Sequence, residues 1–288
     1  MRYVKELSNR NKIVSENTCK SFFKPSDREA YTLKFVFAGE EKCTVNKRNI
    51  SIFPDSFIVL NHGTDYNTTI DSITPVNTLS LAFDASFVKD FSSTSQLSDE
   101  NLLDGKSKNA PLFLETLYPF VGDMKYNVLH LKSQIDKGLD NEMLINEYLH
   151  HCLLNYYGIY HKEITQKVNK LSFIKTKTKE EIIKRLVLAK EYINSNYNTD
   201  VSLDDISAYC CLSVNHLLRT FKEAYGISPY QYLMQLRINR AKHLLKTTDY
   251  PLGEIVGLIG FENTSSFIRL FKNSVCMTPS KFRKETYA

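Results

Sequence analysis

Residues 180–288 contain an internal repeat with a period of about fifty residues, and this repeat constrains the fold more than any other feature. The two copies share an arginine, a phenylalanine, a lysine and a proline at equal spacing. The pairs are Arg219 and Arg269, Phe221 and Phe271, Lys222 and Lys272, and Pro229 and Pro279. Repetition at a fixed period predicts two copies of one supersecondary unit.

Each copy has the pattern of a short helix, a tight turn and a second helix. In the first copy the short helix carries Leu203 and Ile206, and a turn at residues 211–212 follows. Ser213 stands where its hydroxyl would cap the second helix. The second copy repeats this pattern with Leu252 and Ile255, a turn at residues 260–261, and Asn263 as the best candidate for the cap.

The second helix of each copy has an apolar face and a face left for a partner. Leu217 and Phe221, or Phe267 and Phe271, lie one turn apart and are expected in the core. The outward residues are Val214, Asn215, Leu218, Arg219 and Lys222 in the first copy, and Thr264, Ser265, Ile268, Arg269 and Lys272 in the second. Arginine can bind guanine, asparagine can pair with adenine, aliphatic groups can touch thymine methyls, and lysine can reach a phosphate. These ten residues are therefore the candidate DNA contacts.

A longer helix is expected between the two copies. Ser228 is its predicted N-cap, Pro229 fits the first helical position, and Gln231 completes a box-like contact. Such a helix can hold two reading units about one DNA turn, roughly 34 Å, apart. Arg237 lies in the middle of this helix, where a structural pairing is expected rather than contact with bases.

The repeat resembles the DNA-binding domain of the AraC family of bacterial transcription regulators. The residues that carry the resemblance are Ile206, Ser213, Leu217, Arg219, Phe221, Lys222, Gly226, Ser228, Pro229, Arg237, Ala241, Leu244, Leu245, Ile255, Gly260, Phe261, Phe267, Arg269, Phe271, Lys272, Thr278, Pro279 and Arg283. The resemblance implies a double helix-turn-helix domain that binds double-stranded promoter or operator DNA. It also implies a regulator, either an activator or a repressor, with RNA polymerase as a candidate partner.

Four residues depart from the family pattern. Cys211 and Cys276 stand where glycine is usual, and Ser207 and Val256 stand where alanine is usual. A non-glycine residue at positive φ costs about 1 kcal/mol, so the departures affect stability more than function.

Residues 1–91 are predicted to be β-structure. Candidate strands are residues 32–37, 43–45, 50–53, 57–60, 67–70 and 78–83, with turn-forming residues between them. This piece resembles the small cupin-type barrel of many family members. The fold class is thus α+β, with an N-terminal cupin-like β-barrel with flanking helices and a C-terminal all-α double helix-turn-helix domain.

Residues 92–109 are polar and are predicted to be a loop, whereas residues 112–120 and the Met143–Tyr156 stripe have helical spacing. That stripe is either a dimer face or a core face. We therefore expect a sensor and dimerisation domain at residues 1–161, a lysine-rich linker at 162–179 and a DNA-binding domain at 180–288.

The mouth of the barrel is a candidate pocket for a small effector. Alternation suggests the inward residues Phe35, Phe37, Leu60, His62, Tyr66 and Phe83, each of which either lines this pocket or fills the core. His62 is the one histidine in this region, so no metal site is expected. The sequence has no nucleophile elbow, phosphate loop or zinc-binding helix motif, so we expect neither a catalytic residue nor a cofactor.

Charge and cysteine usage agree with a cytoplasmic DNA-binding protein. Residues 1–161 carry 17 basic and 20 acidic residues, whereas residues 179–288 carry 15 and 11, so the C-terminal part is the basic one. The six cysteines form no framework of spacings, and no apolar leader or membrane span is expected. We expect a homodimer that has no contact with a membrane.

Two other functions stay open at this level. A DNA-bending or DNA-modifying protein would need an activated nucleophile at Cys19 or Cys43, whose basic sequence neighbours are Lys20 and Lys42. A protein-interaction module would use the helical repeat to bind another protein, and it would lack strongly salt-dependent DNA binding.

Overall fold

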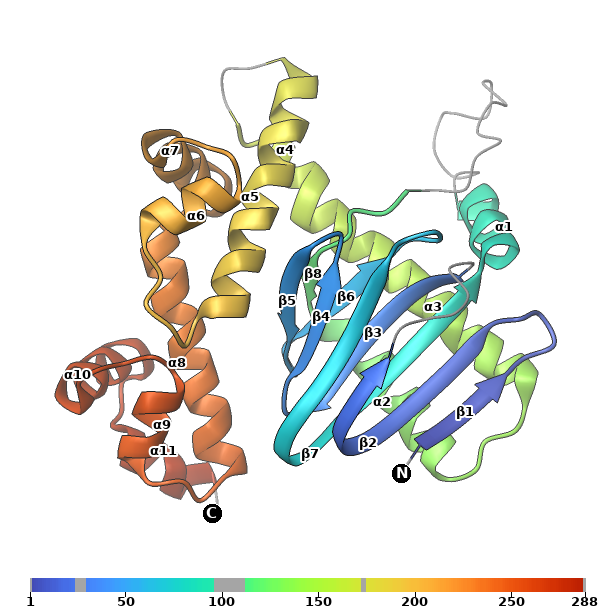
Figure 1. The fold of residues 1–288 in the computed structure, drawn as a ribbon, viewed down its shortest axis with the longest axis horizontal. Helices are drawn as coiled ribbons and strands as arrows, with labels where there is room; N and C mark the ends of the chain where they lie inside the picture. The colour runs from blue at the N-terminus through green and yellow to red at the C-terminus, as the bar shows by residue number, and fades with distance from the viewer. Residues whose placement is uncertain (1, 24–29, 96–111, 172–174, 287–288) are drawn as a thin grey trace. The chain divides into compact units, whose positions relative to one another are not determined.

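A computed structural model describes residues 2–23, 30–95, 112–171 and 175–286. The chain forms two compact units, residues 1–166 and residues 167–288. The first unit combines an antiparallel sheet with helices, and the second is helical (Figure 1). No helix in the described ranges has the length and apolar content that crossing a membrane requires.

The strands of the first unit are β1 (Arg2–Glu6), β2 (Lys12–Phe23), β3 (Ala30–Ala38), β4 (Glu41–Val45), β5 (Arg48–Ile52), β6 (Ser56–Leu60), β7 (Tyr66–Asp84) and β8 (Leu117–Pro119). They form one sheet in the order β1-β2-β7-β3-β6-β8, and the β4–β5 hairpin pairs with β7. The sheet is not closed, because β1, β5 and β8 each pair with one strand among the described residues. The predicted barrel is therefore an open, strongly curved sheet.

β7 is the strand that curves the sheet. Its C-terminal half pairs with β2 and β3, and its N-terminal half pairs with β2 and β4. The prediction of two separate strands at residues 67–70 and 78–83 is wrong, because residues 71–77 between them continue the same strand. The strands β1 and β2, which were not expected, complete the sheet.

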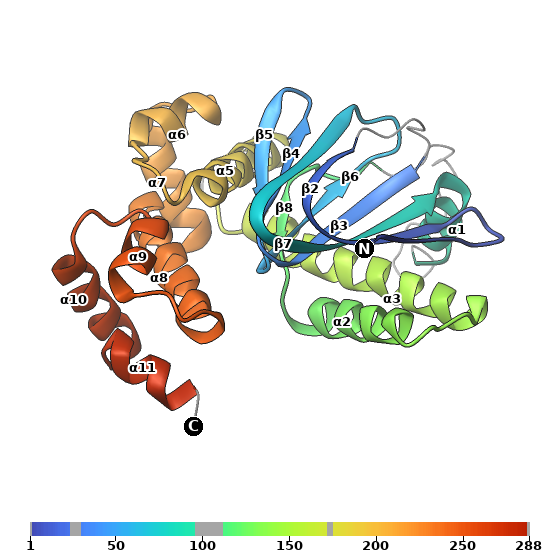
Figure 2. The ribbon, with the colours of Figure 1, turned by 60° about the horizontal axis from the view of Figure 1, so that its bottom comes forward.

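Two apolar cores lie on the two faces of the sheet. One face packs on α1 (Ala85–Ser95), α2 (Gly122–Asp136) and α3 (Glu142–Tyr160), and α2 and α3 lie side by side along it (Figure 2). The other face packs on the β4–β5 hairpin through Cys43, Val45, Ile50 and Ile52. β3 lies between the two cores, and this position explains why Tyr31 to Val36 are all buried.

Three predictions for the middle of the chain need correction. Residues 112–120 are not helical, because Leu117–Pro119 pair with β6 as the edge strand β8. Residues 92–95 belong to α1, and the rest of the predicted loop, residues 96–109, lies outside the described residues. Residues 161–165 form a π-helical turn after α3, and residues 166–168 form α4, so this end of the predicted linker is helical.

The Met143–Tyr156 stripe lies on α3 and mainly faces the core. Ile145, Leu149, Cys152, Leu153 and Tyr156 are buried against the sheet. Met143 and Leu154 point away from that core, with 85% and 42% of their surfaces exposed. The core role is thus established for most of the stripe.

The second unit contains α5 (Thr176–Asn196), α6 (Leu203–Tyr209), α7 (Val214–Tyr225), α8 (Pro229–Thr247), α9 (Leu252–Leu258), α10 (Thr264–Val275) and α11 (Pro279–Thr286). α8 begins as predicted: the Gln231 N–H donates to the Ser228 hydroxyl, and the Ser228 N–H donates to the Gln231 amide oxygen. Pro229 occupies the first turn.

Candidate nucleic-acid interface

The helices α6 and α7 form the first helix-turn-helix unit. A reciprocal cap between Ser202 and Asp205 starts α6, and the Ser213 hydroxyl accepts from the backbone of His216 at the start of α7. Between the two helices Cys211 has a φ of 53°, the left-handed conformation that a tight turn requires. The predicted cap and turn of the first copy are both confirmed.

The helices α9 and α10 form the second helix-turn-helix unit in the same way. Asn263 caps α10 by accepting from the backbone N–H groups of Ser265 and Ser266, at 2.8 and 3.2 Å. Gly260 takes the left-handed turn position with a φ of 77°. No side chain caps α9, which begins after Pro251. The second helix-turn-helix unit therefore has the same geometry as the first, but with fewer helix caps.

The inner faces of α7 and α10 are anchored by aromatic and aliphatic residues. Leu217, Phe221, Phe267 and Phe271 are completely buried, as expected. Phe271 also packs edge-on against Phe282 of α11, with ring centroids 5.6 Å apart. This packing fixes which face of each helix is turned outward.

The ten predicted DNA contacts lie on the outer faces of these two helices. Seven are exposed, namely Asn215, Arg219, Lys222, Thr264, Ser265, Arg269 and Lys272. The other three, Val214, Leu218 and Ile268, are half-buried, so that part of each side chain remains accessible. The two helices thus present matched faces, each with an arginine, a lysine and an aliphatic group. Contact with DNA stays a prediction for every one of these residues.

The departures from glycine fall where the backbone needs positive φ. Cys276 ends α10 with a φ of 61°, at the position where Gly226 ends α7 with a φ of 77°. The other two departures, Ser207 and Val256, are buried, and the Ser207 hydroxyl donates to the carbonyl oxygen of Asp204.

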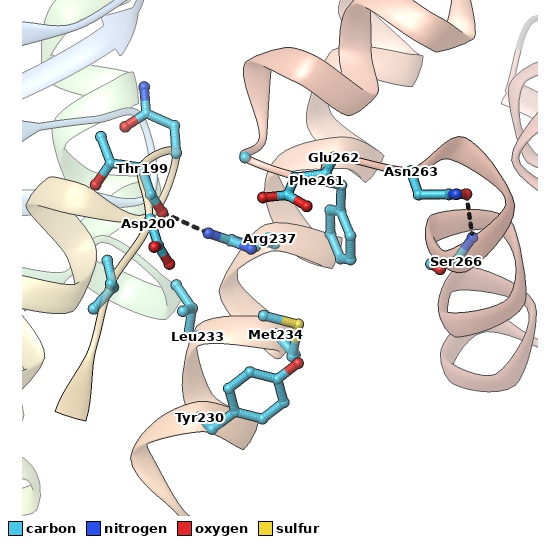
Figure 3. A pocket seen from close by; sticks show the side chains of 13 residues that line it. Thr199, Asp200, Tyr230, Leu233, Met234, Arg237, Phe261, Glu262, Asn263 and Ser266 are labelled. Atoms are coloured by element: carbon cyan, nitrogen blue, oxygen red, sulfur yellow. Dashed lines mark hydrogen bonds between the residues drawn. The ribbon is translucent and has the colours of Figure 1, made fainter.

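Arg237 has the structural role that was expected of it. Its Nε–H donates to the carbonyl oxygen of Tyr197 at 2.7 Å. An Nη2–H donates to the carbonyl oxygen of Thr199 at 2.8 Å, and Figure 3 shows this second bond. Burial lowers the pKa of its guanidinium. Arg237 therefore contributes to the architecture of this unit rather than to its outer surface.

The structure divides the six predicted effector residues between the two faces of the sheet. Phe35 and Phe83 are fully buried in the core beneath α2 and α3, and Phe37 packs half-buried against that core. Leu60 is fully buried in the opposite core, against which Tyr66 packs, and His62 is exposed after β6. The six residues therefore do not converge on one pocket.

Tyr66 lines a polar hollow at one end of the sheet. The cavity has a volume of about 420 Å³, and its other lining residues are Thr44, Asn46, Lys47, Asp65 and Asn67. Burial raises the pKa of the Tyr66 phenol. All six residues that line this hollow carry a polar or charged group, unlike the mainly aromatic set that the alternation suggested.

Sequence reasoning missed a buried ion pair inside the curved sheet. Lys34 Nζ lies 2.7 Å from Glu41 Oε1 and donates to the Thr68 hydroxyl at 3.0 Å. The two charged side chains are only 7% and 3% exposed. The available signal was a lysine within the otherwise apolar run of β3.

The burial of the cysteines and the spacing of residues that can bind metals bear on catalysis by the described residues. Burial raises the pKa of the Cys152 thiol to about 12. Cys43 is buried and Cys19 half-buried, whereas Cys211 and Cys276 are exposed. Across the described ranges, no three His, Cys, Asp or Glu side chains lie close enough together to hold a metal ion.

Comparison with known proteins places the second unit in a known class. A family described as "Helix-turn-helix domain" matches residues 206–285. The bifunctional transcriptional activator/DNA repair enzyme AdaA of Bacillus subtilis is 36% identical over 105 residues, which are 35% of this chain and 50% of AdaA. The chain thus spans about half the length of this relative.

Other similarities cover either the whole chain or its C-terminal third. The Msm operon regulatory protein of Streptococcus mutans is 23% identical over 267 residues, 91% of this chain and 87% of that protein. A solved structure, the C-terminal domain of the response regulator yesN of Fusobacterium nucleatum, is 35% identical. The similarity covers 33% of this chain and 94% of the yesN domain, with a TM-score of 0.32.

Residues 206–285 therefore form a domain of the helix-turn-helix class, in which the helix-turn-helix unit occurs twice. In this domain the chain is similar to proteins that are named as transcriptional regulators.

Proposed function

We propose that this protein binds a promoter or operator sequence by placing α7 and α10 in successive turns of the major groove. The observation that carries the proposal is the pair of matched outer faces, fixed by fully buried anchors and set at the same distance from equivalent caps. A helix of this size fits the major groove, and two such helices read two half-sites about one turn, roughly 34 Å, apart.

Each outer face divides into residues that read bases and residues that hold the backbone. Arg219 and Arg269 are the guanine-binding candidates, since a guanidinium pairs bidentately with the O6 and N7 atoms of guanine. Leu218 and Ile268 are placed to touch thymine methyl groups. Val214, Asn215, Thr264 and Ser265 lie in the first turns, where recognition helices meet base edges. Lys222 and Lys272 lie about one turn beyond Arg219 and Arg269 and reach phosphates.

The test is selection of bound sequences from a random duplex pool by the full chain. We expect a bipartite site whose half-sites are about one helical turn apart. Arg219→Ala and Arg269→Ala should each relax selection in one half only and weaken binding by about 1–3 kcal/mol.

Lys89→Ala is the matched control, because this exposed lysine lies on α1 in the first unit and its loss removes the same charge. It should leave the selected sequence unchanged. Enrichment of no sequence by the full chain would refute the proposal, and the same relaxation of both halves by one variant would refute the assignment of one helix to each half.

For the first unit we propose control by a small polar effector bound in the hollow beside Tyr66. A volume of about 420 Å³ suits a small molecule, and Lys47 and Asp65 offer it one charge of each sign. A thermal-shift screen of sugars, amino acids and organic acids tests this. A hit should lose its effect in both Lys47→Ala and Asp65→Asn. A shift that both variants retain would place the effector elsewhere.

The remaining parts of the proposal concern partners and location. We propose a homodimer formed through the first unit, recruitment of RNA polymerase at the promoter, action in the cytoplasm and no enzymatic activity. The exposed Met143 and Leu154 on α3 support a contact with a second copy. Sedimentation equilibrium of the full chain tests the dimer, and Met143→Glu should weaken it.

A further inference from the structure

Arg237 connects segments that belong to the two helix-turn-helix units. Its side chain leaves the middle of α8 and binds the carbonyl oxygens of Tyr197 and Thr199, in the connection that leads into α6. On its other side the guanidinium lies over the ring of Phe261, 5.4 Å from the centroid. Phe261 belongs to the turn between α9 and α10, so one side chain contacts both units.

Gly260 allows the two units to approach at this point. A Cβ atom there would lie 2.9 Å from the Nη2 atom of Arg237 and 2.9 Å from the backbone of Asn198. The turn at residues 260–261 of the second helix-turn-helix unit is thus in direct contact with the segment that precedes α6. Any side chain at residue 260 would push these two segments apart.

The contact is linked on both sides to the reading helices. Phe261 packs edge-on against Phe267, the buried anchor of α10, with centroids 5.4 Å apart. On the other side, Thr199 is three residues from Ser202, whose cap starts α6. A displacement of the Arg237 side chain therefore affects both helix-turn-helix units.

Helices of both helix-turn-helix units also pack on α8: α5 and α7 contact it, and so do α9 and α11. Beside Arg237 lies an open cavity of about 550 Å³. It is lined by Asn198, Thr199, Asp200 and Val201 from the segment before α6, and by Gly260, Phe261, Glu262, Asn263 and Ser266 from the second helix-turn-helix unit (Figure 3). Next to this open space, Arg237 and Gly260 bring residues 197–199 and the turn at residues 260–261 into direct contact.

We infer that Arg237 and Gly260 set the distance and rotation between the two reading helices, and so decide which half-site spacing the protein accepts. This inference rests on the proposed function. Arg237 is a positioning residue here, because its guanidinium faces the protein interior rather than DNA. Its planar fork binds two carbonyl oxygens while its face lies on a ring, and a lysine cannot do both.

The test measures affinity of the full chain for its selected site and for versions with one base pair inserted or removed between the halves. Each base pair moves one half-site by about 3.4 Å and turns it by about 35°. We expect the wild type to bind the altered spacings at least about tenfold more weakly. Arg237→Lys and Gly260→Ala should reduce that ratio to less than about threefold.

Gly226→Ala is the matched control. Gly226 has the same φ of 77° as Gly260, but a Cβ there meets nothing within 4 Å. This variant therefore carries the same backbone strain without disturbing the contact, and it should keep the wild-type ratio. General destabilisation weakens binding to all spacings by one factor, so the ratio reports positioning alone.

The outcomes separate this inference from the proposed function. If the wild type selects no sequence, the proposed function fails. If the wild type prefers one spacing and both variants keep that preference, or if the wild type accepts all spacings equally, the positioning role is refuted while DNA binding stands.

Discussion

Cys276 ends α10 in the same left-handed backbone conformation in which Gly226 ends α7, with φ angles of 61° and 77°. A Cβ atom in that conformation is strained, whereas glycine adopts it without steric cost. The second helix-turn-helix unit is therefore less stable at this point than the first helix-turn-helix unit.

Cys276→Gly should stabilise the second helix-turn-helix unit by about 1 kcal/mol, because it removes this strain. The measurement is the urea midpoint of the full chain. Cys276→Ala is the control, since it removes the thiol but keeps the Cβ atom, and it should give no gain. An equal gain in both variants would show that the thiol rather than the backbone is unfavourable.

Glu41→Gln should destabilise the first unit by about 3–5 kcal/mol, because the Lys34 ammonium would stay buried without its counter-charge. The double variant Lys34→Met with Glu41→Leu should lose much less, since it leaves no buried charge. A double-mutant cycle by chemical denaturation measures the coupling. Additive losses would mean that the two side chains do not interact.

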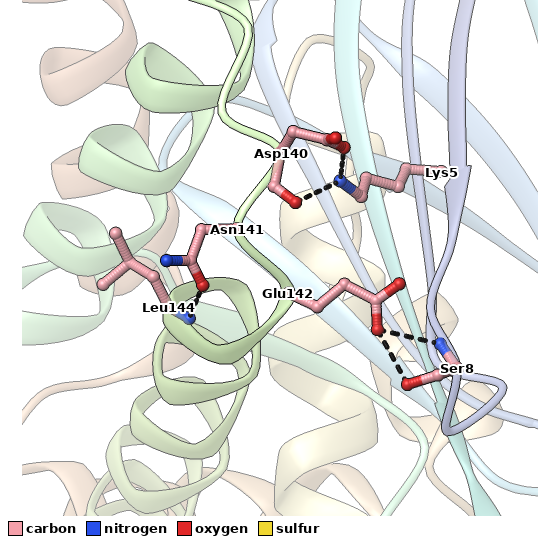
Figure 4. A network of polar contacts seen from close by, with 6 residues as sticks. All are labelled: Lys5, Ser8, Asp140, Asn141, Glu142 and Leu144. Carbon is pink, nitrogen blue, oxygen red and sulfur yellow. Dashed lines mark hydrogen bonds and ion pairs between the residues drawn. The ribbon is translucent and has the colours of Figure 1, made fainter.

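The β1–β2 turn and the start of α3 are joined by polar contacts that predict an acid-sensitive first unit. Lys5 pairs with Asp140, and the backbone and side chain of Ser8 donate to Glu142 at 3.1 and 2.7 Å (Figure 4). The hydrogen bond from Lys5 holds the pKa of Asp140 below its ordinary value of 3.8, and those from Ser8 hold the pKa of Glu142 below 4.5.

Because both pKa values are lowered by folding, the stability they contribute is present above these ordinary values. It is lost as the pH falls through the lowered values. The melting temperature should therefore drop more steeply below about pH 4 in the wild type than in Asp140→Asn/Glu142→Gln. Asp71→Asn is the control, since Asp71 is 80% exposed and lies 3.9 Å from Lys20. Parallel curves for wild type and double variant would rule out the contribution.

Lys222→Ala and Lys272→Ala should weaken DNA binding to about the same degree for every sequence. Each should lower the slope of log affinity against log salt by about 1, because each removes one phosphate contact. The measurement is fluorescence anisotropy over a series of salt concentrations. Sequence-dependent losses would instead assign these lysines to bases.

Alkylation by iodoacetamide at pH 8 should be fast at the exposed Cys211 and Cys276 and very slow at Cys152. Burial raises the pKa of the Cys152 thiol to about 12, so almost none is thiolate at that pH. Mass spectrometry locates the label, and the urea-unfolded chain, in which all six cysteines react, is the control. Fast native labelling of Cys19 or Cys43 would favour the alternative of a DNA-modifying enzyme.

Local features of the second unit were predictable from the sequence. A cap such as Ser228 with Gln231, or Asn263 before α10, depends on residues three or fewer positions apart, and the repeat supplied each feature twice. The inward and outward faces of α7 and α10 follow from helical periodicity for the same reason. Whether Arg219 and Arg269 contact DNA lies beyond periodicity.

The errors concern contacts between distant parts of the chain. Closure of the sheet depends on whether edge strands meet, which no local pattern encodes. Leu117 was assigned to a helix because apolar residues three apart fit either structure, and its pairing with Ile58 decides for a strand. The partners of Lys34 lie on β4 and β7, so the sequence could flag the lysine but not its pairing.

The length and pairing of β7 also determine when the first unit can assemble during synthesis. β2, β3 and β4 are complete by Val45, yet each pairs with β7, which ends at Asp84. On the ribosome these strands must therefore emerge with unpaired edges and wait for almost forty further residues. The exposed interval is when aggregation competes with folding, so chaperone demand should peak at chain lengths before β7 emerges.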